Sequence, residues 1–162
     1  IPDARVQVDN ARFFSQGNKM TYDESVEVAT VAKHLADQSH QFTQYSGVRP
    51  NGVALIIAGV DQKGESIYVT DPSGTYVQYA AVAIGSGSDD VNAFLEKHYN
   101  ENMSLSDAAA LAIAAINLKA EQKESLNHIK MAKVTTEKKI FEKVSETDLL
   151  NYSKNASKFP TS

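Results

Sequence analysis

A glycine-serine stretch is the first place in the sequence where ligand chemistry could occur. Gly85-Ser86-Gly87-Ser88 precedes a predicted helix, and backbone N–H groups at a helix start can bind phosphate with the help of the helix dipole. The stretch lacks the lysine of a P-loop and the third glycine of a dinucleotide-binding turn, and Asp89 and Asp90 would repel an anion. It therefore predicts a strand-to-helix turn with a serine cap, and a nucleotide-binding module remains an alternative.

Nucleophilic and metal chemistry have less support in the sequence. It contains no cysteine, which excludes disulfides, thiolate metal sites and a cysteine nucleophile. No two histidines stand four residues apart with a carboxylate between them; the four are His34, His40, His98 and His128. A stand-alone small hydrolase, the other alternative, would need a serine or threonine near a histidine and an acid, and no motif places one. We therefore expect no catalytic residue, no metal and no cofactor.

Composition is that of an ordinary globular chain. The 162 residues suffice for one domain with a sizeable core, and 42% are hydrophobic and 22% charged. A formal net charge of −4 disfavours nucleic-acid binding. No apolar run is long enough to span a bilayer, and no basic-then-apolar signal opens the sequence. These features predict a cytoplasmic protein with neither a nucleic-acid nor a membrane partner.

Two amphipathic helices open the predicted order of elements. Ala4, Val8 and Ala11 recur at helical spacing, and Gly17-Asn18 is a usual end signal, so the first helix should stop there. Thr21 would then cap a second helix. The predicted buried face of that second helix consists of Val28, Val31, Ala32, Leu35, Ala36, Ser39 and Phe42.

Three strands are predicted next. Residues 53–60 carry no polar side chain, which predicts a strand covered on both faces in the middle of a sheet. Turn residues at 62–64 and 71–74 separate it from strands over 66–70 and 75–84. The three should form an antiparallel meander.

The rest of the sequence alternates helices and strands. It predicts a helix over 89–99, a helix capped by Ser104, strands over 129–135 and 140–144, and a helix capped by Ser145. The buried stripe expected on the helix over 89–99 is Val91, Phe94, Leu95 and His98. The small-residue face expected on the next helix is Ala108, Leu111, Ala112, Ala115 and Ile116. Grouped helices between runs of antiparallel strands indicate an α+β fold, with helices layered on sheets.

Four stretches of the sequence together resemble one protein family. They are Tyr45-Ser46-Gly47-Val48-Arg49-Pro50-Asn51-Gly52-Val53, an apolar strand ending Ala58-Gly59-Val60-Asp61, then Thr70-Asp71-Pro72-Ser73-Gly74-Thr75-Tyr76 and Ala83-Ile84-Gly85-Ser86-Gly87. In this order they are similar to archaeal-type α subunits of the 20S proteasome core particle, over a region from Pro2 to about Met103. Two positions differ, since Asn51 stands where the family usually places an aromatic residue and Ser46 where a second glycine is common.

The resemblance implies a specific fold. Proteasome subunits form a four-layer α/β/β/α Ntn-hydrolase sandwich, of which this sequence would supply the later part, without the family's N-terminal region. Residues 1–157 would form a single, N-terminally incomplete proteasome-subunit-like domain, and residues 158–162 a flexible C-terminal tail. A sandwich without its early strands would expose sheet edges and apolar faces, so we do not expect the chain alone to be a complete, stable monomer.

The resemblance also implies a function. In this group of hydrolases the nucleophile is a chain's own first Thr, Ser or Cys, and Ile1 has no such side chain, so the chain would be a non-catalytic, gating subunit. Seven α subunits would form an outer ring, stacked on β subunits that hold the active threonines, and would admit unfolded proteins for degradation. A proteasomal ATPase activator is a possible partner, although the family's docking residues for it are absent from this sequence.

The same resemblance assigns the site residues. The turn that lines the axial pore annulus would consist of Tyr45, Ser46, Gly47 and Val48. The residues that support this turn would be Arg49, Pro50 and Gly52. Arg49 is expected to brace the turn through a charge-assisted hydrogen bond, to a partner that the sequence does not identify.

Overall fold

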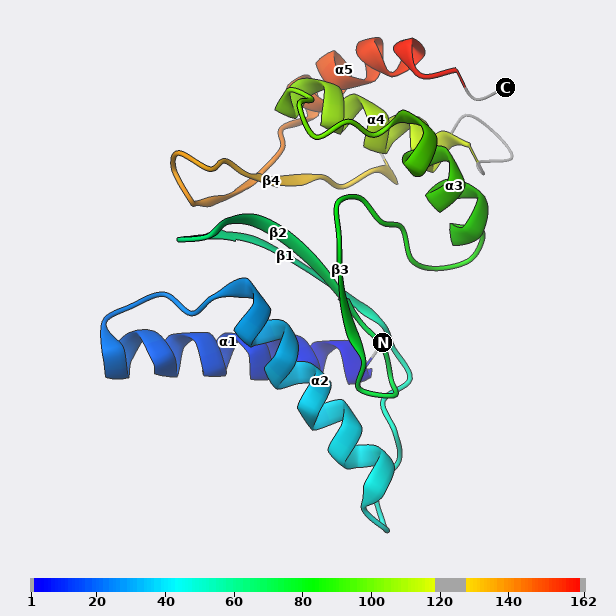
Figure 1. Cartoon of the computed structure of the whole chain (residues 1–162). Coiled ribbons are helices and arrows are strands. Elements are labelled where there is room, and N and C mark those ends of the chain that lie inside the picture. The colour runs from blue at the N-terminus through cyan, green and yellow to red at the C-terminus, as the bar shows by residue number, and fades with distance from the viewer. Residues whose placement is uncertain (1, 119–127, 161–162) are drawn as a thin grey trace. The chain divides into compact units, whose positions relative to one another are not determined.

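The computed structural model describes residues 2–118 and 128–160 (Figure 1). Along these described residues, two helices, three strands, two helices, two strands and one helix follow one another, as predicted, and a short 3₁₀ helix comes after the last α-helix. This content is α+β. The described residues fall into two compact units: unit 1 lies within Ile1–Ala80 and Thr135–Lys139, and unit 2 within Ala81–Val134 and Ile140–Ser162. None of the described helices combines the length and apolar character needed to cross a bilayer.

The first helix of unit 1, α1 (Pro2–Tyr22), is longer than predicted. Gly17 does not adopt the left-handed conformation that ends a helix, and a single glycine inside a helix costs only about 1 kcal/mol relative to alanine. Thr21 is not a cap either, because it lies within α1 and donates its hydroxyl to the carbonyl of Gly17 at 2.8 Å. The left-handed residue is Asp23, whose N–H donates to the carbonyl of Lys19 at 2.9 Å.

The buried side of α1 also differs from the prediction. Val8 is 47% exposed, whereas Gln7 is only 3% exposed and is the buried residue of this helix. An apolar residue on a helix need not be buried, and a buried amide needs a hydrogen-bond partner. Gln7 has one in Ser39 of the second helix, as described below.

The second helix, α2 (Val28–Gln44), buries most of its predicted face, including Val28, Leu35 and Ser39. Its first residue is held from another element: Val28 donates its N–H to Asp61 Oδ2 at 3.0 Å, while the Glu27 side chain makes no cap hydrogen bond. This bond lowers the pKa of the Asp61 carboxyl. A carboxylate at a helix start is favoured by the exposed N–H groups and by the helix dipole.

Three antiparallel strands complete unit 1: β1 (Leu55–Asp61), β2 (Gly64–Thr70) and β3 (Tyr76–Tyr79). The order β1-β2-β3 confirms the predicted meander. The predicted place of the first strand is wrong, because β2 is central and β1 lies at the edge of the described sheet. Alternate residues of β1 are exposed, and Ile56 is 44% exposed, so this strand is not covered on both faces.

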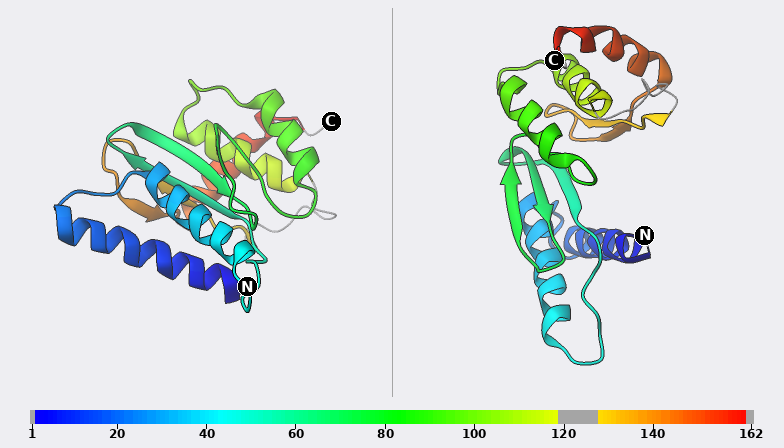
Figure 2. Two further views of the ribbon diagram at one scale, coloured as in Figure 1. Left: turned by 60° about the horizontal axis from the view of Figure 1, so that its bottom comes forward. Right: turned by 90° about the vertical axis from the view of Figure 1, so that its right-hand side faces the viewer.

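Helix α2 packs against one face of this sheet (Figure 2). Gly59 of β1 allows the close approach, since a Cβ at this position would lie 2.8 Å from Val28 Cγ2. Gly74, in the turn between β2 and β3, lies against α2 in the same way, with the Ala36 carbonyl oxygen 2.8 Å from where its Cβ would be.

The predicted tight turn at 71–74 is present and is organised by Asp71. One carboxylate oxygen accepts the Ser73 N–H at 2.8 Å, and the other accepts the Thr75 hydroxyl at 2.6 Å. Hydrogen bonds from Ser73 and then Thr75 lower the pKa of Asp71 from its ordinary value of 3.8 to about 2. Gly74 has φ +92°, which a residue with a Cβ rarely adopts.

The described part of unit 2 contains three α-helices: α3 (Ser88–His98), α4 (Leu105–Asn117) and α5 (Glu146–Asn155). The predicted caps are confirmed, because Ser104 accepts the Asp107 N–H and Ser145 accepts the Asp148 N–H, both at 3.1 Å. The predicted face of α4 is too narrow. Ile116 is 48% exposed, whereas the buried residues are Ala109, Ala110, Leu111, Ile113, Ala114 and Ala115. Helix α4 contacts α3, α5 and the 3₁₀ helix, so several of its sides are covered.

A two-stranded hairpin also belongs to unit 2. Strands β4 (Ala132–Val134) and β5 (Phe141–Lys143) pair antiparallel, as predicted, although both are shorter than expected. Near the end of the chain, the 3₁₀ helix η2 spans Ala156–Lys158. Phe159, in the segment predicted as a flexible tail, packs against the cluster that contains Phe94 and Leu111, while residues 161–162 of that segment lie outside the described residues.

Candidate functional site

The turn that follows α2 is exposed. Tyr45 caps the helix by donating its N–H to the Gln41 carbonyl at 3.2 Å, and its side chain is 66% exposed. Gly47 has φ +88°, and no described heavy atom lies within 4 Å of where its Cβ would be. Val48 is 49% exposed. Residues 45–48 thus form an open turn at the end of α2 (Figure 1). The aromatic ring of Tyr45 and the isopropyl group of Val48 are available to other molecules.

Asp3 of α1 binds the chain just after this turn. Its Oδ1 accepts Arg49 Nη2 at 2.7 Å and its Oδ2 accepts Arg49 Nη1 at 2.7 Å, a bidentate pair. The same Oδ2 also accepts the Gly52 N–H at 3.0 Å. The Arg49 hydrogen bonds, and then the Gly52 N–H, lower the pKa of Asp3 from its ordinary value of 3.8 to about 2. Arg49 additionally donates to the carbonyl of Pro50 at 3.2 Å.

A second polar contact lies between Asn51 and the helices. Asn51 Nδ2 donates to Ser39 Oγ at 3.1 Å, and Gln7 Nε2 approaches the same oxygen at 3.5 Å. Gln7 and Ser39 are each 3% exposed. Asn51 therefore connects the loop to the buried hydroxyl of Ser39. The family resemblance leads one to expect an aromatic ring at this position.

Sequence reasoning identified the turn but missed Asp3 and Gln7. Both were assigned no role, because a helix rich in polar residues gives no sign of which side chains face a distant loop. Asp3 and Arg49 are 46 residues apart, and only the tertiary structure brings them together. One signal was available: Asp3 and Gln7 are four residues apart, so they lie on one face of a helix.

The glycine-serine stretch forms the predicted turn but without the predicted serine cap. Gly87 is the residue before α3, with φ +76°, and no side-chain hydrogen bond caps this helix. Asn92 holds the incoming chain by accepting the Ala83 N–H at 2.7 Å and donating to the Ala83 carbonyl at 3.1 Å. Asp89 and Asp90 occupy the first turn of α3, where their charges satisfy the helix dipole and oppose phosphate.

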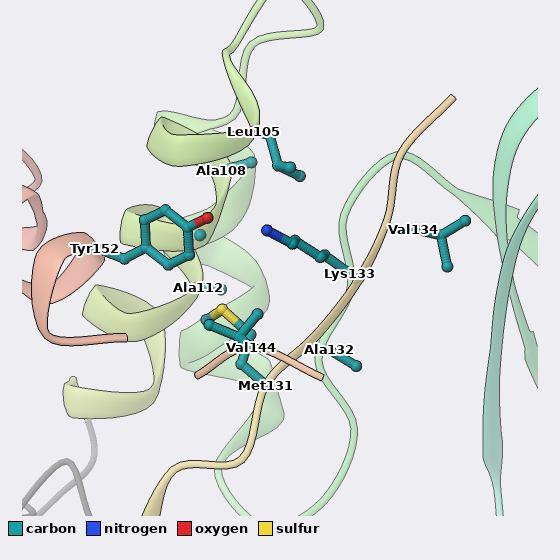
Figure 3. Close-up of a pocket in the computed structure, with 10 residues that line it drawn as sticks. Leu105, Ala108, Ala112, Met131, Ala132, Lys133, Val134, Val144 and Tyr152 are labelled. Atoms are coloured by element: carbon teal, nitrogen blue, oxygen red, sulfur yellow. The ribbon is translucent and has the colours of Figure 1, made fainter. Parts of the chain in front are cut away.

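A cavity of about 280 Å³ within unit 2 lies between α4, α5 and the hairpin (Figure 3). Lys133 extends toward the Tyr152 hydroxyl in this cavity, and its amine lies 3.9 Å from the Glu142 carboxylate. The remaining described lining is apolar: Leu105, Ala108, Ala109, Ala112, Met131, Ala132, Val134 and Val144. No serine, threonine or histidine is among these described lining residues, so the cavity does not hold the hydroxyl–imidazole pair of a serine-type hydrolase.

Two of the four histidines, His34 and His98, pack against other parts of the chain. The His34 ring stacks on Phe14 with centroids 4.0 Å apart, and His98 Nδ1 lies 2.9 Å from the Phe94 carbonyl oxygen. Within residues 2–118 and 128–160, no three histidine, aspartate or glutamate side chains are grouped so that they could hold a metal ion.

Comparison with known proteins identifies the family to which this chain belongs. A sequence model described as "Proteasome subunit" matches residues 1–134. The chain belongs to the proteasome subunit family. Among curated relatives, the chain is 42% identical over 156 residues to "Proteasome subunit alpha" of Archaeoglobus fulgidus. It is 43% identical over 152 residues to the protein of that name from Pyrococcus horikoshii, and 41% identical over 134 residues to that from Picrophilus torridus.

The proteasome relatives are longer than this chain. The three matches cover 96%, 94% and 83% of this chain but only 63%, 58% and 57% of the relatives. The chain therefore spans less than two thirds of the length of these relatives. The region that the family model matches, residues 1–134, includes the candidate turn and its supports at 45–52.

Proposed function

We propose that this chain is a non-catalytic α-type subunit of the proteasome core particle. Its copies, seven to a ring, form the outer ring and the axial entry pore, and act with β subunits that carry the catalysis. The observation that supports this most directly is the exposed turn at 45–48, braced at its base, in a chain similar throughout to proteins named proteasome subunit alpha. We place its work in the cytoplasm; the family resemblance leaves a proteasomal ATPase activator open as a partner, although the family's docking residues for it are not among these 162 residues.

A pore that selects by size needs side chains of suitable bulk and no reactive group. A folded domain of 100 residues has a radius of gyration of about 13 Å, so an opening walled by seven turns admits an extended strand and excludes a folded protein. In each copy Tyr45 supplies bulk and apolar surface, while Ser46 and Gly47 leave room. Exclusion and assembly are then the functions of this subunit.

The bonding of two internal threonines supports a subunit without catalysis. Thr21 donates its hydroxyl to the carbonyl of Gly17, and Thr75 donates its hydroxyl to Asp71. The alternatives, a stand-alone hydrolase or a nucleotide-binding module at Gly85–Ser88, gain no support from these contacts.

The four-layer sandwich is part of the same proposal. The face of the sheet opposite α2 is apolar, because Ile56 is paired with Val69 and Val69 with Val77 across the three strands. Ile56 and Val77 are 44% and 50% exposed. A second sheet laid on this face, as in the sandwich, would bury this surface and add roughly 25 cal/mol of stabilisation per Å².

The decisive experiment is the mass of the assembled particle, combined with a pore variant. Native mass spectrometry of the full-length protein should give a species containing seven copies, and the chain without β subunits should hydrolyse no fluorogenic peptide. With β subunits present, Tyr45→Ala should increase the degradation of an unfolded protein relative to that of a tetrapeptide. Tyr22→Ala is the matched control, since Tyr22 is exposed to the same degree, 69% against 66%, but lies at the end of α1. Peptide hydrolysis by the chain alone, or a monomeric mass, would refute the proposal.

A further inference from the structure

The first two turns of α1 carry two polar side chains, one of which contacts the loop after α2 and the other α2 itself. Asp3 binds Arg49 and the Gly52 backbone, and Gln7 approaches the Ser39 hydroxyl that also accepts Asn51. Because residues four apart share a helix face, both contacts come from one side of α1. Gln7 meets α2 before the exposed turn, and Asp3 meets the chain after it.

The turn itself is weakly held. Within residues 45–48, Tyr45 donates its N–H to the Gln41 carbonyl, and Gly47 has open space around its Cβ position. The direction in which the turn projects is therefore set at its base, by residues 49–52. The strongest contact there is that of Asp3, with three hydrogen bonds of 2.7, 2.7 and 3.0 Å on one carboxylate.

We propose that Asp3 is a positioning residue for the pore turn: its carboxylate, through Arg49 and Gly52, fixes the direction in which Tyr45–Val48 project. This inference rests on the proposed function only in taking residues 45–48 to line a pore. The contacts from which it is argued lie within a single chain. It gives α1 a role in the pore, since a displacement of the first turn of α1 is transmitted to the turn by a rigid bidentate pair.

A carboxylate is needed because all three contacts are donors. Oδ1 faces one guanidinium nitrogen, and Oδ2 faces the other guanidinium nitrogen and a backbone N–H. An asparagine in this place would present an amide NH₂ to at least one of these donors, which leaves a donor facing a donor. Lysine in place of Arg49 would keep the charge but lose the two parallel bonds.

The sequence permits a direct measurement of the position of the turn. It contains no cysteine, so Ser46→Cys creates a single thiol in the turn that can carry a nitroxide label. Electron paramagnetic resonance of the labelled full-length protein should show a more mobile label in Asp3→Asn than in the parent. The matched control is Asp9→Asn, because Asp9 binds Arg12 at 2.7 Å on the same helix in a contact that does not reach the loop.

An activity readout accompanies the spectra in the assembled particle. Asp3→Asn should change the degradation of an unfolded protein relative to that of a tetrapeptide by about two- to tenfold, the range expected for losing one such contact. Asp9→Asn should leave this ratio unchanged. The exchange Asp3→Arg with Arg49→Asp should restore part of both readouts, because it rebuilds the ion pair but not the acceptor for Gly52.

The outcomes separate the inference from the proposed function. If Asp3→Asn folds and its label is as immobile as in the parent, or if Asp9→Asn mobilises the label equally, the positioning role is refuted. If Asp3→Asn does not fold, Arg49→Lys is measured instead, and an immobile label there refutes the role. If Tyr45→Ala alters the substrate ratio and Asp3→Asn does not, only the positioning role fails. If Asp3→Asn mobilises the label while Tyr45→Ala leaves the ratio unchanged, the positioning of the turn stands and the pore function fails.

Discussion

Replacing Gly74 by alanine should destabilise unit 1 strongly. This glycine combines φ +92° with a close approach to α2. A Cβ would lie 2.5 Å from the Cβ of His40, 2.8 Å from the Cα of His40 and 2.8 Å from the carbonyl oxygen of Ala36. Two of these three are backbone atoms, which cannot rotate away as the end of a flexible side chain can.

The magnitude follows from two contributions. A Cβ on left-handed backbone costs about 1–2 kcal/mol. Overpacking against the helix backbone costs about 1–3 kcal/mol. The free energy of unfolding should therefore fall by about 2–5 kcal/mol, which corresponds to a decrease in the melting temperature of roughly 4–20 °C for a chain of this size.

Gly47→Ala is the matched control. Gly47 has nearly the same conformation, φ +88°, but no described heavy atom within 4 Å of its Cβ position. It should show the strain alone, about 1–2 kcal/mol. The difference between the two variants isolates the steric contribution.

Urea unfolding followed by circular dichroism measures both variants. The midpoint should shift while the slope with denaturant stays constant, since neither substitution changes the surface exposed on unfolding. Equal losses in Gly74→Ala and Gly47→Ala would refute the close packing of the 71–74 turn against α2.

Three further predictions concern capping, packing and protonation. Ser104→Ala and Ser145→Ala should each lower the free energy of unfolding by about 1 kcal/mol, because each removes the acceptor of a helix N–H, and chemical denaturation measures the loss. Ile113→Ala should cost about 2–5 kcal/mol and Ile116→Ala less than about 0.5 kcal/mol, because their side chains are 0% and 48% exposed; the same assay tests this contrast. Asp71 has a lowered pKa of about 2, so its contribution to stability is complete above its ordinary value of 3.8 and is lost as the pH falls toward 2; carboxyl NMR titration should find its midpoint in that lower range.

Local signals in the sequence predicted most of the element order. Serine at 104 and 145 caps a helix as expected, because a capping bond spans only three residues. The meander at 55–79 was predicted for the same reason, since turn residues and alternating apolar stretches are neighbours in the chain. Such interactions are decided over a few residues and need no knowledge of the fold.

The wrong predictions arose where the surrounding fold, and not the local sequence, decides the structure of a segment. Gly17 carries a helix-ending signal but keeps helical backbone, and Thr21 bonds back within the helix instead of capping the next one. The stretch that contains Ile56 is apolar throughout, yet it lies at the edge of the described sheet. An apolar run predicts that burial is favourable, but which strand covers it is a property of the whole fold.

The candidate site shows the same division in one place. A turn at residues 45–48 is readable because glycine after a helix is a local signal, whereas the choice of this turn as the site came from the family resemblance. What holds the turn is not decided by neighbouring residues, since the Asp3–Arg49 contact spans 46 residues and the Gln7–Ser39 contact spans 32. A polar residue on an amphipathic helix is ordinarily assigned to solvent, and that default fails when a loop that supplies an arginine and a backbone N–H lies beside it. The exposed fractions show this failure. The side chain of Asp3 is 18% exposed and that of its partner Arg49 is 72% exposed, so the residue on the helix is the more buried of the two. A positioning contact should therefore be sought where two sequence features occur together. One is a pair of polar side chains four residues apart on the first turns of a helix, and the other is an arginine-proline turn later in the chain.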